Sequence, residues 1–469
     1  MKKGTIGRIV MLVLAVAIMV AVPFLRPAEN YFPGTEAYSL IRQSAGLSWY
    51  DSLSYGGRIY PYSAGLPMLL SISPVLISKI LPTLSVIFML LFIYLILKDK
   101  GLECKEFAVL VAAASPPMLY LASTLSRFSI PLVLLLAGYY FLEKQEISLK
   151  LYSILFLGLI PLFDFAFGII ALFMLLIYAS LNKRFKWVAW LCFISMLLVI
   201  AIFAGYAISK AGLPETVLFS ALSPGINGKL MMVIAELGAL AGLSLFGLIA
   251  ATIGIRNNWK KKYKSPFMFF SVAFLAVMSF FRPEPLMILN IFVSVFAALG
   301  IFTIMGQKFE SDIVKMLTFF VLACGLVFSG AMAADRISSS LPDQSIIMGI
   351  SALNKLPEGT VYSHYDRGHW ISFAGHKNVM DDNFLFAPSV NERWIDSNTL
   401  LSIRDIKKAR EIFDKYNIRY IWIDAEMKDK LWENDEDGLL FLLKYSGSIE
   451  KRYDHLGVEI WEVMEEEDS

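Results

Sequence analysis

Long apolar runs fill the chain up to about residue 335, and this feature limits the folds open to it more than any other. A helix needs about 20 apolar residues to cross a bilayer core of about 30 Å, because each residue rises about 1.5 Å. The runs lie at 8–25, 78–97, 106–121, 128–143, 150–163, 165–181, 187–208, 231–255, 266–281, 285–305 and 316–334. The sequence therefore predicts a polytopic α-helical membrane protein with about 11 spans.

Composition separates this part of the chain from the remainder. Hydrophobic residues make up 57% of the whole and charged residues only 17%, whereas about 25% of an ordinary soluble domain is charged. After Asp335 the composition becomes that of a normal globular protein. We predict a transmembrane domain at 1–335, with a long first external loop at 26–64, and a soluble domain at 336–469. The net charge of +2 indicates no nucleic-acid partner.

Lys and Arg concentrate in alternate loops, for example at Arg256 and in Lys260-Lys261-Lys262. Such loops face the cytoplasm in membrane proteins. With an odd number of spans, this places the N-terminus in the cytoplasm of a multi-pass cell-membrane protein and residues 336–469 outside. The exported part contains no cysteine, so its fold has no disulfide framework.

The exported part alternates strand and helix signals. Strands are predicted at 359–363, 419–423 and 457–462. Helices are predicted at 403–416, with Ser402 as the cap and an end near Asn417, and at 429–444. This alternation predicts a C-terminal mixed α/β domain built on a small layered sheet.

Three charged residues interrupt or border the apolar runs: Asp164, Glu236 and Arg282. A charge at the centre of the membrane costs about 2.5–3.5 kcal/mol on insertion scales, so it usually faces a cavity or a partner. Near an interface the cost falls, because a long side chain reaches water. Both interpretations stay open for these residues.

Two other segments are rich in polar and aromatic side chains. The first external loop holds Glu36-Ala37-Tyr38 and then Arg42; a loop of this length is often functional, but it also suits a solvated loop on the bilayer surface. The exported part holds His364 and His369 close together. Their spacing is no zinc pattern, and a strand-to-helix turn with an aromatic surface is the simpler interpretation.

The segment from Ser363 to Ile371 reads SHYDRGHWI. It resembles the phrase SWWDYGYWI, which contains the WWDxG signature of the catalytic subunit of oligosaccharyltransferase, in particular of the single-subunit archaeal and bacterial forms. The matching positions are Ser363, Asp366, Gly368, Trp370 and Ile371. Glu36, Tyr38 and Arg42 are similar to the first loop of that family, which belongs to the GT-C superfamily of membrane glycosyltransferases. Val233-Ile234-Ala235-Glu236 is similar to its TIxE motif.

The resemblance implies a glycosyltransferase that moves a sugar or oligosaccharide from a polyprenyl-phosphate-linked donor to an exported protein or glycan acceptor, protein Asn among them. It implies Mg²⁺ or Mn²⁺, with Glu36 and Asp164 as ligands, and catalytic roles for Glu36 and Glu236. The substrate-binding residues it implies are Tyr38, Arg42, Arg127, Arg282, Tyr365, Asp366 and Trp370. The apolar bundle would hold the lipid carrier.

Two alternatives remain. The second external loop carries Arg127 and no acid, whereas the family places metal ligands there. This favours a catalytically silent relative that binds a lipid-linked glycan or an exported partner, although Arg127 would also bind a donor phosphate directly. A transporter would suit Glu236 and Arg282, but the sequence shows no inverted repeat. For the segment around Tyr365, we expect a position facing the Glu36 loop and Glu236.

Overall fold

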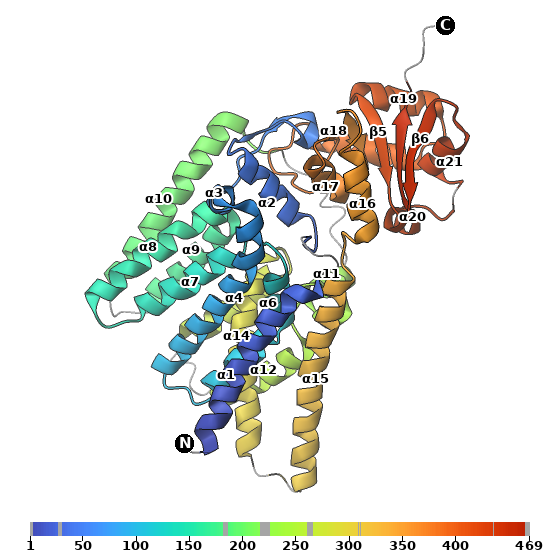
Figure 1. Ribbon diagram of the computed structural model, residues 1–469. Coiled ribbons are helices and arrows are strands. Elements are labelled where there is room, and N and C mark those ends of the chain that lie inside the picture. The colour runs from blue at the N-terminus through green and yellow to red at the C-terminus, as the bar shows by residue number, and fades with distance from the viewer. Residues whose placement is uncertain are drawn as a thin grey trace. The chain divides into compact units, whose positions relative to one another are not determined.

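The computed structural model describes residues 3–26, 31–181, 186–215, 226–259, 266–307, 309, 311–434 and 436–464. The chain divides into two compact units (Figure 1). The first comprises Met1–Asn30, Ser63–Phe203 and Pro224–Ser339, and the second comprises Tyr31–Tyr62, Ala204–Ser223 and Ser340–Ser469. The segment after the first apolar helix is thus grouped with the C-terminal residues.

The first unit is helical. Its elements are α1 (Lys3–Ala21), η1 (Val22–Leu25), α3 (Gly65–Ile72), α4 (Pro74–Asp99), α5 (Lys105–Ala113), α6 (Pro116–Ser123), α7 (Ser129–Leu142), α8 (Ile147–Phe163), α9 (Phe165–Leu181), α10 (Lys186–Ala211), α11 (Ile226–Val233), η4 (Ala235–Leu237), α12 (Leu245–Asn258), α13 (Pro266–Met278), α14 (Glu284–Gly306) and α15 (Asp312–Ser338). The last residues of α10 belong to the second unit.

Five helices in the described part of the chain are long and apolar enough to cross a membrane. They are Ile6–Leu25, Pro74–Asp99, Trp187–Ala211, Glu284–Gly306 and Asp312–Ser338. Shorter apolar helices coincide with the predicted runs at 128–143, 150–163, 165–181 and 266–281. The helical, apolar character of this part is confirmed, and the count of 11 spans stays a prediction.

Two predicted runs are not continuous helices. The run at 106–121 is the pair α5 and α6, bent by 60°. Pro116 and Pro117 have no backbone N–H, so they start a new helix and do not continue the old one. The run at 231–255 is interrupted between α11 and α12, where Gly238 adopts a φ of 133°. A side chain at that φ would strain the backbone, so glycine suits the turn.

Helix α14 lies at the centre of the first unit, and 78% of its apolar window is buried. Its Gly300 faces Gly254 of α12. A Cβ atom added at Gly300 would lie 2.0 Å from the Ala250 carbonyl oxygen, and one at Gly254 would lie 2.0 Å from that of Phe296. Small residues let two backbones approach this closely. Helices within a bilayer associate by such close packing, because the hydrophobic effect does not drive their association there.

The second unit contains two sheets. A short hairpin pairs β1 (Tyr50–Asp51) with β2 (Arg58–Ile59), after helix α2 (Glu36–Ala45) and across η2 (Ser54–Gly56). The larger sheet has the order β4-β3-β5-β7-β6. Its strands are β3 (Thr360–Tyr362), β4 (Lys377–Asn378), β5 (Ile418–Ile423), β6 (Ile449–His455) and β7 (Val458–Val463). The pairs β3–β4 and β3–β5 are parallel, and the other two are antiparallel.

Helices of the second unit connect and cover these strands (Figure 1). They are α16 (Gln344–Leu353), η6 (Tyr365–Arg367), α17 (Gly368–Phe373), α18 (Val390–Ser402), α19 (Ile406–Lys415), α20 (Ala425–Leu431) and α21 (Gly438–Tyr445). Strand β5 is the centre of the hydrophobic core, since Tyr420, Ile421, Trp422 and Ile423 are all buried. The predicted C-terminal α/β fold is confirmed.

The sequence prediction differs from the structure in two helices of this unit. Helix α19 begins at Ile406, capped by Asp405, whose side chain accepts the N–H of Lys407, and not by Ser402. Its predicted end near Asn417 is confirmed, since that residue adopts a φ of 50°. The predicted helix at 429–444 is two helices, α20 and α21. Asp424 caps the first, and Gly438 starts the second with a φ of 49°.

Candidate functional site

Three connections of the first unit bring charged residues together. Arg127 lies between α6 and α7, Asp164 separates α8 from α9, and Glu284 is the first residue of α14. The Nε atom of Arg127 lies 3.4 Å from Oδ2 of Asp164, and its Nη2 lies 3.7 Å from Oε1 of Glu284. We call these three residues the Arg127 cluster.

Burial divides the Arg127 cluster into an enclosed and an open part. Asp164 and Glu284 are only 4% and 1% exposed, whereas the Arg127 side chain is 39% exposed. A buried carboxylate is costly unless an opposite charge accompanies it. The guanidinium therefore compensates two buried acids, and the Arg127 side chain is itself only partly exposed.

The two acids are fixed by helix starts. Asp164 caps α9, because its Oδ1 accepts the N–H of Phe167 at 2.5 Å. Glu284 lies in the first turn of α14, where the helix dipole favours a negative charge. Burial raises the pKa of Asp164, and Arg127 and, more weakly, Arg282 oppose this rise because they favour the charged form. The structure thus brings together Asp164, Arg127 and Arg282, which the sequence had singled out separately.

Glu236 lies in the break between α11 and α12. Its Oε2 accepts the N–H of Leu245 at 2.9 Å, at the start of α12, and its Oε1 accepts the hydroxyl of Ser329. Arg336 donates to the carbonyl oxygens of Ala235 and Ala239 on the same turn. The carboxylate is held firmly at a helix N-terminus but remains partly exposed.

Most residues of the predicted first external loop belong to the second unit, which includes Tyr31–Tyr62. Glu36 begins α2. Tyr38 is buried, its hydroxyl lies 3.4 Å from the Phe32 carbonyl oxygen, and its ring meets the edge of Phe373 at 5.1 Å. Arg42 forms a bidentate ion pair with Asp51, in which both N···O distances are 2.5 Å.

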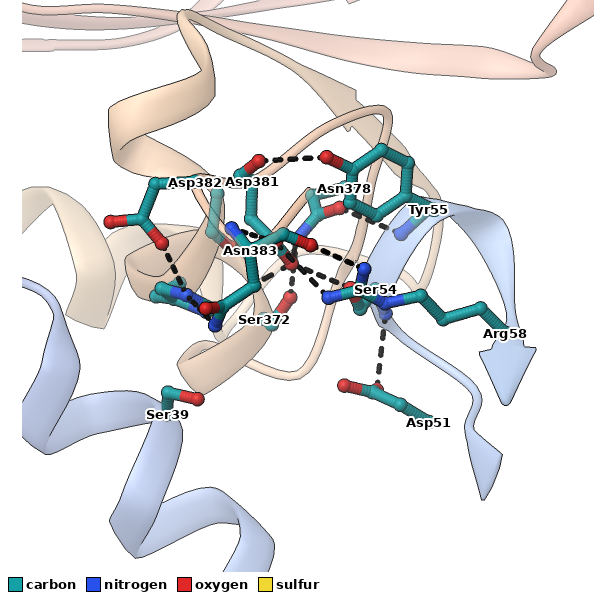
Figure 2. Close-up of polar contacts among 12 residues, drawn as sticks. Ser39, Asp51, Ser54, Tyr55, Arg58, Ser372, Asn378, Asp381, Asp382 and Asn383 are labelled. Atoms are coloured by element: carbon teal, nitrogen blue, oxygen red, sulfur yellow. Dashed lines mark hydrogen bonds and ion pairs between the residues drawn. The ribbon is translucent and has the colours of Figure 1, made fainter. Parts of the chain in front are cut away.

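A second buried network centres on Asp381, which is fully buried (Figure 2). Arg58 Nη2 lies 3.2 Å from Oδ1, and the Ser54 hydroxyl donates to Oδ2 at 2.5 Å. The hydroxyl of Tyr55 donates to the Asp381 carbonyl oxygen at 2.8 Å, and its backbone N–H donates to the side chain of Asn378 at 2.8 Å. These bonds join the hairpin region at 50–59 to the segment at 378–383.

His369 extends this network. Its Nε2 lies 2.8 Å from Asp382 Oδ1, and its Nδ1 lies 3.9 Å from Asp381 Oδ2 and is buried without a hydrogen-bond partner. Burial by itself lowers the pKa of His369, but the two carboxylates outweigh it, so the pKa is raised above its usual value. By their distances, His369, Asp381 and Asp382 form one group that could hold a metal ion.

The segment that resembles the WWDxG signature follows β3. Asp366 is 41% exposed and lies 2.5 Å from His364 Nδ1. Arg367 binds Asp366 and Asp424. Trp370 is buried, and its Nε1 donates to the Gly34 carbonyl oxygen at 3.4 Å. The segment therefore faces the Glu36 loop, as expected. The expected approach to Glu236 stays a prediction.

Tyr365 packs its ring against Phe384 and Trp394, with centroids 5.6 and 5.2 Å away. It is partly exposed. Together with the half-exposed Asp366, this aromatic group forms a surface that a peptide or sugar could contact.

The sequence prediction missed Glu284 and the pair of Arg58 with Asp381. Glu284 had one usable signal, its place directly after Arg282-Pro283 at the start of an apolar run. Arg58 and Asp381 are more than 300 positions apart, and nothing in the local sequence of either indicates the other.

A cavity of about 490 Å³ lies within the first unit. Most of its lining is apolar, including Leu97, Leu136 and Phe267, and a few polar groups such as Tyr178 and Glu143 lie on its wall. An apolar cavity of this size fits a section of a hydrocarbon chain.

No protein-family profile and no curated protein sequence matches the chain. Solved structures do match its fold. Oligosaccharyltransferase AglB of Archaeoglobus fulgidus, in complex with an inhibitory peptide and a dolichol-phosphate, has a TM-score of 0.65 at 13% identity, over 99% of this chain and 75% of that one. The same protein was also solved in complex with zinc and sulfate.

Two further structures match over almost the whole chain. ArnT from Cupriavidus metallidurans, bound to undecaprenyl phosphate, has a TM-score of 0.56 at 11% identity, over 98% of both chains. Arabinofuranosyltransferase AftD from Mycobacteria has a TM-score of 0.55 at 14% identity, over 97% of this chain and 40% of that one. All are GT-C glycosyltransferases. The predicted GT-C fold, resembling oligosaccharyltransferase, is therefore confirmed.

Proposed function

We propose that this protein is a membrane glycosyltransferase that transfers a sugar or oligosaccharide from a polyprenyl-phosphate-linked donor to an exported acceptor. The Arg127 cluster carries the proposal. It places a partly exposed guanidinium on two buried carboxylates, with Arg282 acting electrostatically on one of them, in a chain that has the GT-C fold. Guanidinium groups bind phosphate oxygens through directed, charge-assisted hydrogen bonds.

The neighbours support this donor class. AglB was solved with a dolichol-phosphate and ArnT with undecaprenyl phosphate. In the present chain the apolar cavity would accept part of a prenyl chain, and Arg127 with Arg282 would bind the phosphate. Membrane lipid and the lipid-linked glycan are therefore the proposed partners within the bilayer.

In the reaction, the acceptor atom forms a bond to the anomeric carbon of the sugar while the bond from that carbon to the phosphate oxygen breaks. The electron pair leaves with the phosphate, whose growing negative charge the arginines stabilise. The acceptor proton passes to a carboxylate, and Glu36 is the proposed base. Glu236 would orient the acceptor.

The second unit would recognise the acceptor. The half-exposed surface of Tyr365 and Asp366, with Trp370 buried behind it, is the proposed contact for a protein or glycan. Tyr38 and Arg42 would act by positioning the loop that starts with Glu36, because their own side chains are engaged by Phe373 and Asp51. AglB was solved with an acceptor peptide tethered to it, and protein Asn is one acceptor that the proposal allows.

The resemblance also implies Mg²⁺ or Mn²⁺ at Glu36 and Asp164. These ions need several oxygen ligands, which for Mg²⁺ lie at about 2.0–2.1 Å in near-octahedral geometry. At Asp164, one oxygen accepts the Phe167 N–H and the other faces the guanidinium of Arg127. The Asp164 half of the implied pair therefore does not fit a divalent cation, and no step above depends on one.

The proposal is tested in cells from which the gene has been deleted. Exported glycoproteins and cell-surface glycans are compared by mass spectrometry after complementation with the natural chain, Glu36→Ala or Arg127→Gln. We expect the natural chain to restore a glycan that the deletion removes, and both variants to lower it by about 100-fold. Lipid-linked donor should accumulate in the membranes of both variants.

Arg404→Gln serves as the matched control, since Arg404 is a 56%-exposed surface arginine paired with Asp437. It should restore the glycan fully. If the deletion changes neither glycans nor lipid-linked sugars, the enzyme proposal is wrong. A glycan restored equally by Glu36→Ala and Arg127→Gln would instead indicate a catalytically silent relative that assists another transferase.

A further inference from the structure

Glu284 and Asp164 form a pair of carboxylates that the fold encloses. Both are more than nine-tenths buried, and they are close enough for Glu284 to repel the charge of Asp164. Oε2 of Glu284 is buried without a hydrogen-bond partner. Two enclosed carboxylates of this kind require positive charge, because leaving either uncompensated costs several kcal/mol.

Arg127 supplies that positive charge to both acids at once. Its Nε faces Asp164 and its Nη2 faces Glu284, at 3.4 and 3.7 Å. A guanidinium is planar, carries five N–H donors and stays protonated at every physiological pH. One side chain can therefore face two acids at once, and that of Arg127 is 39% exposed.

We propose that Arg127 takes the place between Asp164 and Glu284 that a divalent cation would otherwise need, so that this site meets the donor phosphate with a guanidinium and requires no metal ion. The part that concerns the phosphate rests on the glycosyl transfer proposed above. The part that concerns the cation rests only on the geometry of the three side chains.

The proposal predicts what removing the guanidinium does. Without Arg127, two buried carboxylates lose the cation that pairs with them, and hard divalent ions prefer such oxygen ligands. Arg127→Ala should therefore convert the site into a divalent-cation site. Arg127→Lys keeps the positive charge and should not.

Mn²⁺ binding to the full-length protein in lipid nanodiscs tests this by electron paramagnetic resonance. Relative to the natural chain and Arg127→Lys, the Arg127→Ala protein should gain one Mn²⁺ per chain, bound at least about tenfold more tightly. Adding Asp164→Asn to Arg127→Ala should remove the gain. Any ion held at His369, Asp381 and Asp382 is common to all four proteins and cancels in the comparison.

Two results would overturn the proposal. One is a Mn²⁺ ion on the natural chain that Asp164→Asn releases. The other is a folded Arg127→Ala protein, and a folded Arg127→Gln protein beside it, that gain no Mn²⁺. Should neither variant fold, Mn²⁺ binding to the natural chain and to Asp164→Asn still tests the proposal. A loss of bound Mn²⁺ in Asp164→Asn would show that the natural site holds a metal ion.

Transfer activity provides a separate readout. Chelation with EDTA should change the transfer rate of the natural protein by less than about twofold, and Mn²⁺ should partly restore Arg127→Ala. A rate abolished by EDTA and recovered with Mn²⁺ in the natural protein would contradict the proposal. If no protein transfers sugar, the proposed function fails, while the Mn²⁺ titration still decides the question of the cation.

Discussion

At the scale of single residues, arginines neutralise the enclosed acids of both units. Arg58 pairs with the fully buried Asp381, and Arg127 faces Asp164 and Glu284. Arginine suits these positions better than lysine, because its planar group donates in several directions and does not lose its proton on burial. An arginine of the chain itself thus supplies the positive charge next to each set of buried acids.

His369 gives the second unit a pH-dependent stability. Its raised pKa means that the folded state binds the proton more tightly than the unfolded chain, whose histidine pKa is about 6.5. The stabilisation is therefore fully present below about pH 6.5 and is lost as pH rises through the higher pKa of the folded state. We expect the melting temperature of the natural chain, relative to His369→Gln, to fall as pH rises from about 6 to 9.

The charged groups around His369 are Asp381, Asp382 and, at longer range, Arg42, which opposes the rise in pKa. Subtracting the His369→Gln curve removes the contribution of His376, whose pKa burial lowers. A difference between the two proteins that stays constant over this range, or that grows with pH, would contradict the prediction.

At the scale of helices and strands, the contact between α12 and α14 depends on two glycines. A Cβ atom at Gly300 would meet the Ala250 carbonyl oxygen at 2.0 Å, so the helices must separate to accept it. Overpacking of this kind costs about 1–3 kcal/mol. We expect Gly300→Ala to lower the melting temperature of the purified protein clearly, as measured by intrinsic fluorescence in detergent.

Gly306, at the end of the same helix, is the matched control. Nothing lies within 4 Å of a Cβ atom added there, so Gly306→Ala should leave the melting temperature nearly unchanged or raise it slightly. Equal losses from the two substitutions would contradict this account, because Gly→Ala raises helix propensity and only Gly300 lies against the backbone of α12.

At the scale of the whole molecule, the topology stays a prediction that labelling can test. Lys98 is exposed at the end of α4 in a segment that we place in the cytoplasm, and Arg404 is exposed in the part that we place outside. With Cys104, Cys192 and Cys324 replaced, a membrane-impermeant maleimide should label Arg404→Cys on intact cells or spheroplasts. Lys98→Cys should be labelled only after the membrane is opened.

This orientation rests on the bias of Lys and Arg between loops and on an odd number of spans. Labelling of Lys98→Cys on intact cells, with Arg404→Cys protected, would reverse it. Equal labelling of both positions before and after permeabilisation would mean that the two segments face the same side. An even number of spans would then separate them, which contradicts the predicted odd number.

Local patterns predicted much of the element list. Apolar runs marked α1 and the helices from α4 to α15 but not α2 or α3, and β-branched and aromatic residues marked β5 and β7. Short strands such as β4, with two residues, gave no periodic signal. The breaks between α5 and α6 and between α11 and α12 were missed, because hydropathy averages across the prolines and glycines that make them.

An apolar helical part and a C-terminal α/β fold could be predicted from the sequence, because hydropathy and residue periodicity are local properties. Its motifs also indicated the GT-C fold that the structural neighbours confirm. Which charged side chains meet depends on the packing of the folded chain. Arg127, Asp164 and Glu284 come from three separate connections, and helix packing alone sets the 3.4 and 3.7 Å distances that make them one cluster.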